Sequence, residues 1–151
     1  GEDVSQQNTY YRSFIPLYGV AWKFMGNMNF FTRFPADVGS SGLVNPYIFA
    51  FYTVNKKLTL RADGNLFYSS HNLLDSKKQK QNRYLGFESD LSFNYKPNKL
   101  FDINFGFSFL TATESMVLLN KMNNADKTPL WSYLSISFKP QTLVLYKKNK
   151  I

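Results

Sequence analysis

The sequence predicts an all-β protein: an antiparallel up-and-down meander of long amphipathic strands that forms all or part of a transmembrane-type β-barrel. Apolar and polar residues alternate over segments longer than the ~5–6 residues of typical globular strands. Short and long connections alternate between these segments. The chain of 151 residues is rich in the strand-forming aromatics, with 15 Phe and 10 Tyr.

The clearest strand is predicted at 57–70, KLTLRADGNLFYSS. Every second residue there is uncharged and mostly apolar, and the residues between them are polar, with Phe67 as the single exception. The same period predicts further strands, strong at 84–96, 101–109 and 130–138 and weaker at 25–34, 43–54 and 142–146.

The connections differ in length in a regular way. Tight turns are predicted at 55–57 and 97–99, where Asn, Lys and Pro favour chain reversal. Longer links fall at 35–42, 70–83 and 113–128. Short turns on one rim and long loops on the other are typical of membrane barrels.

The third long link has helical potential. Thr111 and Glu114 have the spacing of a capping box, and the segment ESMVLLNKM that follows contains no helix breaker. One or two helical turns are therefore predicted within 113–128.

Composition bounds the chemistry. The length predicts one domain over 1–151, with 141–151 as a possible additional tail. No cysteine is present, which excludes disulfides and thiol nucleophiles. The single histidine, His71, has no second histidine near it, and no phosphate-loop or nucleophile-elbow motif occurs. We therefore expect no enzyme activity, no catalytic residues, no metal and no cofactor.

Two orientations of the strands remain open. In a membrane barrel the apolar rows face lipid and the polar rows face a wet lumen. In a soluble, lipocalin-like barrel the apolar rows enclose an apolar small ligand. Strand length and aromatics near strand ends favour the membrane orientation. These aromatics are Tyr52, Tyr68, Tyr95, Phe101, Phe109 and Phe138.

Two segments, FIPLYGVAWKFMGNMNFF (14–31) and GLVNPYIFAFYTVNKKLTLRADGNLFY (42–68), resemble the C-terminal part of alginate-export-type porins of Bacteroidetes outer membranes. The segment 85–140, with a Trp-containing strand that ends in KP, is similar to the closing hairpins of that family. The resemblance spans roughly residues 14–140. It implies a bacterial outer-membrane channel for small polar or acidic solutes, such as oligosaccharides.

The sequence also departs from the family pattern. Asn29 and Asn45 stand where the family usually has Asp, and Asn65 stands where a His-containing strand face is common. The tail QTLVLYKKNKI extends past the usual end and lacks a terminal aromatic residue. The resemblance therefore supports fold and location more than any particular solute.

Charged residues on the polar strand faces are the candidate site. Arg61, Asp63, Glu88 and Asp90 lie on adjacent predicted strands, where cross-strand side chains come within reach. They form either a structural network or a charged constriction that selects solutes by size and sign. Arg33, Asp102 and Asn104 extend this set of candidate lumen residues.

A basic loop is the second candidate. The chain carries a formal net charge of +8. In the segment 77–83 the charge is either simply solvated or contacts polyanions, such as lipopolysaccharide phosphates or acidic sugars. Because no aromatic residues alternate with its basic residues, nucleic acid is not expected as a partner. These residues are Lys77, Lys78, Lys80 and Arg83.

The number of predicted strands raises the question of closure. Six or seven strands are fewer than the about eight that close a side-chain-filled barrel. The free edges, expected near 25–34 and 130–146, are predicted to pair with strands from an N-terminal portion or a second copy. In the alternative, residues 8–24 fold back as an extra strand pair and close a small barrel.

Overall fold

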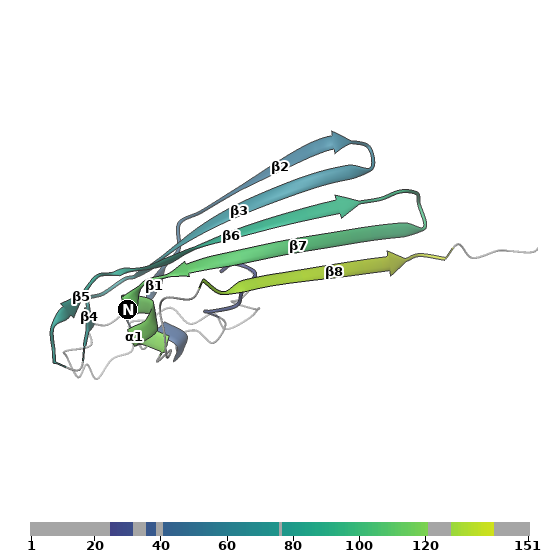
Figure 1. Cartoon of the computed structure of the whole chain (residues 1–151). Coiled ribbons are helices and arrows are strands. Elements are labelled where there is room, and N and C mark those ends of the chain that lie inside the picture. Colours follow the sequence, from purple (N-terminus) through teal and green to yellow (C-terminus); the bar gives the residue numbers. More distant parts are fainter. Residues whose placement is uncertain (1–24, 32–35, 39–40, 76, 121–127, 141–151) are drawn as a thin grey trace, which may run out of the picture.

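Five long strands lie side by side in one antiparallel sheet, in the order β2–β3–β6–β7–β8 (Figure 1). The computed structural model describes residues 25–31, 36–38, 41–75, 77–120 and 128–140. Its elements are η2 (Ala36–Val38), β1 (Leu43–Val44), β2 (Tyr47–Asn55), β3 (Leu58–Ser69), β4 (Leu73–Leu74), β5 (Lys80–Gln81), β6 (Tyr84–Tyr95), β7 (Phe101–Ala112), α1 (Glu114–Asn120) and β8 (Leu130–Phe138).

The long strands follow one another in sequence as a meander, so the predicted antiparallel all-β fold is confirmed. Within the described residues the sheet is open, with β8 at one edge and β2 at the other. The short strand β1 pairs with the last residues of β3. None of the described helical segments has the length and hydropathy needed to cross a membrane.

The strand predicted at 25–34 is wrong for the residues that are described. Residues 25–31 form successive turns, with Gly26 at φ 78° and Asn29 at φ 59°. These left-handed conformations break an extended strand. The edge strand is therefore β2, and residues 8–24, 32–34 and 141–151 lie outside the described residues.

Both short turns are stabilised by an asparagine side chain. Asn55 Oδ1 accepts hydrogen bonds from the backbone N–H of Lys57 at 2.8 Å and of Leu58 at 3.1 Å. Asn98 Oδ1 accepts from the residues that follow it in the same way. Such local bonds are why Asn favours reversals.

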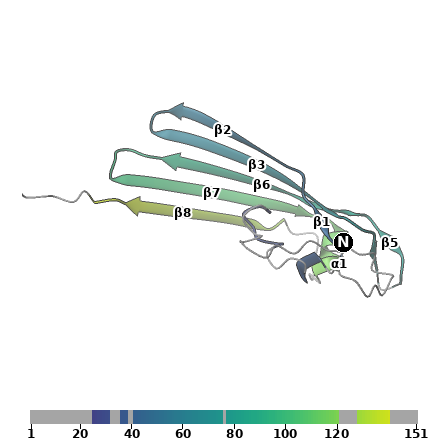
Figure 2. The ribbon, with the colours of Figure 1, turned by 180° about the vertical axis from the view of Figure 1, so that it is seen from behind.

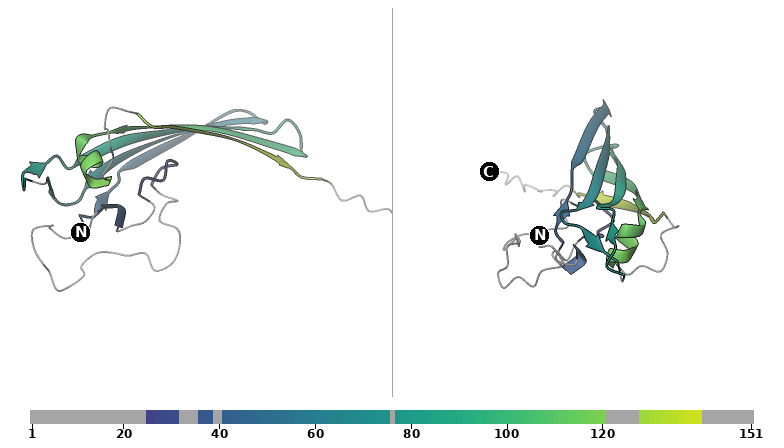
Figure 3. Two further views of the ribbon diagram at one scale, coloured as in Figure 1. Left: turned by 60° about the horizontal axis from the view of Figure 1, so that its bottom comes forward. Right: turned by 90° about the vertical axis from the view of Figure 1, so that its left-hand side faces the viewer.

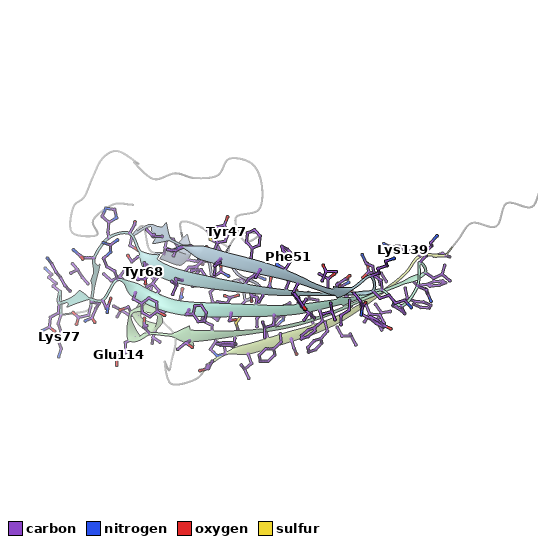
Figure 4. All side chains as sticks on the ribbon, turned by 90° about the horizontal axis from the view of Figure 1, so that it is seen from above. Tyr47, Phe51, Tyr68, Lys77, Glu114 and Lys139 are labelled. Atoms are coloured by element: carbon purple, nitrogen blue, oxygen red, sulfur yellow. The ribbon has the colours of Figure 1, made fainter. Side chains whose placement is uncertain are left out.

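The long connections gather at the opposite end of the sheet from these turns, as predicted. That end holds α1 and the β4–β5 hairpin, seen from both sides in Figures 1 and 2. Figure 4 shows Lys77, in the β4–β5 connection, and Lys139, after β8, at opposite ends. The hairpin was not expected from the sequence.

The predicted helical turns are present as α1, but their cap differs from the prediction. Thr111 pairs with Phe87 inside β7, because this strand extends to Ala112. The residue before the helix is Thr113, whose carbonyl oxygen accepts from the Met116 and Val117 N–H groups. Its hydroxyl donates to the Tyr84 carbonyl oxygen at 2.8 Å, which ties the helix to β6.

The pairing registers give the sheet two distinct faces. The polar face comprises the odd-numbered residues of β2, β3 and β8 and the even-numbered residues of β6 and β7; the alternate residues form the apolar face. Large side chains of the apolar face are exposed on β2, β6, β7 and β8, for example Ile48 (75%), Phe93 (42%), Phe105 (42%) and Leu134 (65%), and those of β3 are half-buried.

The small hydrophobic core lies on the polar face, at the end with the long connections. Phe67, the apolar exception in its row, is fully buried and packs on Phe31 with ring centroids 4.8 Å apart. A β-bulge places Leu85 and Gly86 opposite Phe67, which turns Leu85 into the same cluster. The cluster is completed by Val38, Leu73, Leu110 and Met116.

The sheet is curved, and it arches over α1 and η2 (Figure 3, left). Because Val38 of η2 and Met116 of α1 pack in the core cluster on the polar face, the polar face is the concave one. The convex face is the apolar one, and within the described residues no helix covers it (Figure 3).

Candidate functional site

Two carboxylates at the centre of the polar face are almost completely removed from solvent. Glu88 is 0% exposed and Asp90 is 3% exposed. In the register Glu88 faces Asn65 and Asp90 faces Asp63, so three of the four predicted residues meet across β3 and β6. Their burial is unusual because isolated charges are costly to remove from water.

The turn segment 25–31 covers these carboxylates. The Met28 N–H donates to Glu88 Oε1 at 2.8 Å, and the Asn27 N–H donates to Asp90 Oδ2 at 3.4 Å. Gly26 lies so close to the Glu88 carboxylate that a Cβ atom at this position would overlap it. A glycine with positive φ therefore permits the backbone to approach the carboxyl group.

The fourth predicted residue, Arg61, is held by its neighbours. Its Nε donates to both carboxylate oxygens of Asp63, at 2.9 and 2.8 Å. Its Cζ lies 5.8 Å from the ring centroid of Phe49 and 5.1 Å from that of Phe51, within the range of cation–π attraction. Arg61 thus forms a salt bridge with Asp63 and extends over the rings of Phe49 and Phe51 on β2.

Aromatic residues border the polar face at both edges of the sheet. On β2, the rings of Tyr47 and Phe49 stack with centroids 6.3 Å apart. On β8, Trp131 and Tyr133 lie with centroids 5.0 Å apart. Tyr133 folds inward over Gly106, where a Cβ atom would overlap its ring. Covering a strand glycine with an aromatic ring is a known way to stabilise a sheet.

Together these groups enclose an open cavity of about 590 Å³ between the sheet and the turn segment. This volume is in the range of small-molecule sites, roughly 300–1,000 Å³. Charged and polar side chains form its floor, and aromatic residues form its two sides. It is lined by Gly26, Asn27, Asn29, Tyr47, Ile48, Phe49, Arg61, Asp63, Asn65, Asp90, Ser92, Trp131 and Tyr133.

The remaining lumen candidates lie elsewhere. Asp102 and Asn104 share a separate network near the short turns, in which Asn94 Nδ2 donates to Asp102 Oδ1 at 2.6 Å. Lys96 Nζ is 3.5 Å from Asp102 Oδ2. Arg33 lies outside the described residues. The described members of the predicted set therefore lie in two places: Arg61, Asp63, Glu88 and Asp90 at the cavity, and Asp102 and Asn104 near the short turns.

The basic loop occupies the end with the long connections. Asp75 organises it, because its Oδ1 accepts from the backbone N–H groups of Lys77 and Gln79, both at 2.8 Å. Arg83 Nε donates to the Ser69 carbonyl oxygen at 2.8 Å. The four basic side chains, those of Lys77, Lys78, Lys80 and Arg83, are all exposed.

Several cavity residues were absent from the sequence-based candidates. The sequence could have indicated Trp131 and Tyr133, since the alternation in 130–138 places them on the polar face. Nothing in the local sequence indicates that residues of segment 25–31 line the cavity. Their position depends on turns that bring them over strands distant in sequence. His71 Nδ1 lies 3.1 Å from Ser70 Oγ and from the Ser41 carbonyl oxygen, away from the cavity residues.

No family model matches the chain, and no curated protein or solved structure is significantly similar to it. The resemblance to alginate-export-type porins therefore rests on the sequence motifs alone and stays a prediction.

Proposed function

We propose that this chain is part of a transmembrane β-barrel of a bacterial outer membrane, and that its polar face lines an aqueous pathway for small polar solutes. One observation carries the proposal. Large side chains of the apolar face are exposed on four of the five long strands and half-buried on the fifth, β3, while the fully buried residues gather on the polar face. A soluble sheet is expected to bury its apolar face instead.

Strand length agrees with a bilayer. β3, β6 and β7 each have 12 residues. At ~3.3 Å per residue such a strand extends about 40 Å, and a tilt of ~45° reduces its span to about 28 Å. This matches the hydrocarbon thickness of about 30 Å.

Aromatic residues lie at both ends of the apolar face. At the short-turn end, Phe101 and Phe138 pair across β7 and β8 with ring centroids 5.1 Å apart. At the other end, Tyr68 and Tyr84 pair across β3 and β6 at 5.2 Å. Aromatic girdles at the two interfaces are typical of outer-membrane barrels.

The alternative function, a soluble barrel that binds an apolar ligand, requires the apolar face to be concave. The sheet instead curves toward its polar face. The core cluster and α1 lie inside this curve, on the polar side. This curvature favours the membrane orientation, in which the convex apolar face contacts acyl chains.

The open edges indicate how such a barrel is completed. In the part of the chain that the structure describes, no strand pairs with the outer edges of β2 and β8, and an unpaired sheet edge cannot face hydrocarbon. We propose that further strands pair with these edges, either from another part of the same protein or from a second copy. The exposed basic loop lies beyond one end of the strands, where its charges reach lipopolysaccharide phosphates.

The test is association with vesicles by the full 151-residue chain. Refolded protein is mixed with phosphatidylcholine vesicles, washed with urea and floated on a density gradient. We expect the chain to float with the lipid. A chain that stays monomeric and folded without detergent, with its apolar face protected from solvent, would overturn the proposal.

A matched pair of double variants makes this test specific to one face. Phe93→Gln with Phe105→Gln alters two exposed side chains of the apolar face whose rings lie 6.0 Å apart. Asn94→Gln with Asn104→Gln alters register partners on the polar face of the same strands. We expect flotation to fall for the first pair and to persist for the second.

A further inference from the structure

The cavity on the polar face has unbalanced charge among its described residues. Asp63 is paired by Arg61, through hydrogen bonds from Nε to both of its oxygens. The salt bridges of the described part of the chain are Arg61–Asp63 and Lys96–Asp102, and neither involves Asp90 or Glu88. Neither buried carboxylate therefore has a salt-bridge partner among the described residues, and Asp90 is the one of the two that lines the cavity.

Buried oxygen atoms without a hydrogen-bond partner lie on Asp90 and on its neighbours in β6 and β7. Among the described residues they include Glu88 Oε2, Asp90 Oδ1 and Ser108 Oγ. Glu88 and Asp90 are two residues apart on one face of β6, and Ser108 is the register partner of Asp90 on β7. Asp90 lines the cavity and is 3% exposed. Such a group is costly unless something donates to it.

A cation bound in the cavity would offset this cost, because its positive charge supplies the counter-charge that the Asp90 carboxylate lacks. An ammonium group that carries N–H would in addition donate to the free oxygen. A bare metal ion fits the site poorly. No set of three His, Asp or Glu side chains in the described residues is placed to hold one. The cavity volume of about 590 Å³ also far exceeds what a single ion fills.

The aromatic borders specify the rest of the ligand. Tyr47 and Phe49 stand on one side of the cavity, and Trp131 and Tyr133 stand on the other. Aromatic faces attract ammonium groups through cation–π interactions and also contact the ligand's carbon atoms. The site therefore combines the Asp90 carboxylate on its floor with aromatic walls, of which Phe49 already lies near Arg61 and Tyr47, Trp131 and Tyr133 remain for a ligand.

We propose that the cavity binds a small organic cation, with its ammonium group against Asp90 and its carbon skeleton between the aromatic borders. The proposal deepens the proposed function, on which it rests for the idea that the bound molecule is the solute that passes. It names cationic rather than acidic solutes as the class that the site selects.

The test measures binding of choline and of its uncharged carbon analogue, 3,3-dimethylbutan-1-ol, to the full chain. Saturation-transfer NMR follows their methyl protons with the protein in a polyoxyethylene detergent, which carries no charge. We expect choline to bind at least tenfold more tightly than the alcohol. Equal affinity, or tighter binding of acetate than of choline, would overturn the proposal.

Variants locate the interaction. Asp90→Asn removes the charge but keeps the shape, and we expect it to lower choline affinity at least tenfold while leaving the alcohol unchanged. Asp102→Asn removes a carboxylate of the same face outside the cavity, and it should leave both unchanged. If Asp90→Asn does not fold, Trp131→Leu serves instead, with an expected loss of at least fivefold. Undiminished choline binding by the folded variant would contradict the proposal.

The two proposals fail in different ways. Vesicle flotation tests membrane association without any solute, and the NMR titration tests binding without a bilayer. A chain that floats but does not prefer choline would refute the cation site alone. A chain that prefers choline but stays free of vesicles would refute the membrane proposal alone.

Discussion

Leu134 and Ser135 are neighbours on β8 whose side chains point to opposite faces of the sheet. Leu134 is 65% exposed on the apolar face, and Ser135 is exposed on the polar face. Their register partners are Phe105 and Asn104. Replacement of each by Arg therefore places the same charge on either side of one strand.

The expected difference follows from the depth of this pair. Leu134 is the middle residue of Leu130–Phe138, so its side chain is predicted to lie near the bilayer midplane. An Arg on the lipid face there costs about 2–4 kcal/mol. A loss of about 2.7 kcal/mol is roughly a hundredfold change in the folding equilibrium. Ser135→Arg faces water and should cost within about 0.5 kcal/mol.

The assay is urea unfolding of both variants in phosphatidylcholine vesicles, followed by circular dichroism, at equal protein concentration. Leu134→Ala is the control that removes the side chain without adding charge. We expect only Leu134→Arg to lower the free energy of unfolding by about 2–4 kcal/mol, the cost of an Arg that faces lipid. Equal losses for Leu134→Arg and Ser135→Arg, or a loss below about 0.5 kcal/mol for Leu134→Arg, would refute the reasoning.

Three further substitutions test the packing of the fold, each by urea unfolding. Phe67→Ala removes a fully buried ring that packs on Phe31, and it should cost about 3–5 kcal/mol; a loss below about 1 kcal/mol would contradict that core. Gly106→Ala should destabilise by displacing the Tyr133 ring, and addition of Tyr133→Ala should relieve part of the loss, whereas additive effects would exclude the contact. Asn98→Ala removes the acceptor of two turn hydrogen bonds and should cost about 1 kcal/mol, unlike an exposed Lys99→Ala control.

Period-2 alternation was enough to predict most of the sheet. The strand predicted at 130–138 is β8 in full, and the predictions at 57–70 and 84–96 differ from β3 and β6 by one residue at each end or less. These segments are long and strongly two-faced, and their pairing follows from the short turns at Asn55 and Asn98. The meander could therefore be derived from local sequence alone.

The site depended on contacts that local patterns do not contain. Segment 25–31 carries a weak alternation, but two left-handed residues turn it across the carboxylates of β6. Phe67 and Leu85 interrupt the alternation of polar and apolar residues. Both pack in the small core on the polar face, which Leu85 reaches through a β-bulge. The four charged residues could be placed on one face in advance. The turn segment above them could not.

The central claim, that the apolar face of the sheet contacts lipid and the polar face contacts water, is tested most directly on β7. Because the chain has no cysteine, single cysteines at Asp102, Ile103, Asn104, Phe105 and Phe107 can each carry a nitroxide spin label in vesicles. We expect relaxation by oxygen to dominate at the three apolar positions, and relaxation by a water-soluble nickel chelate to dominate at Asp102 and Asn104. An inverted alternation, or water accessibility at all five positions, would contradict the account.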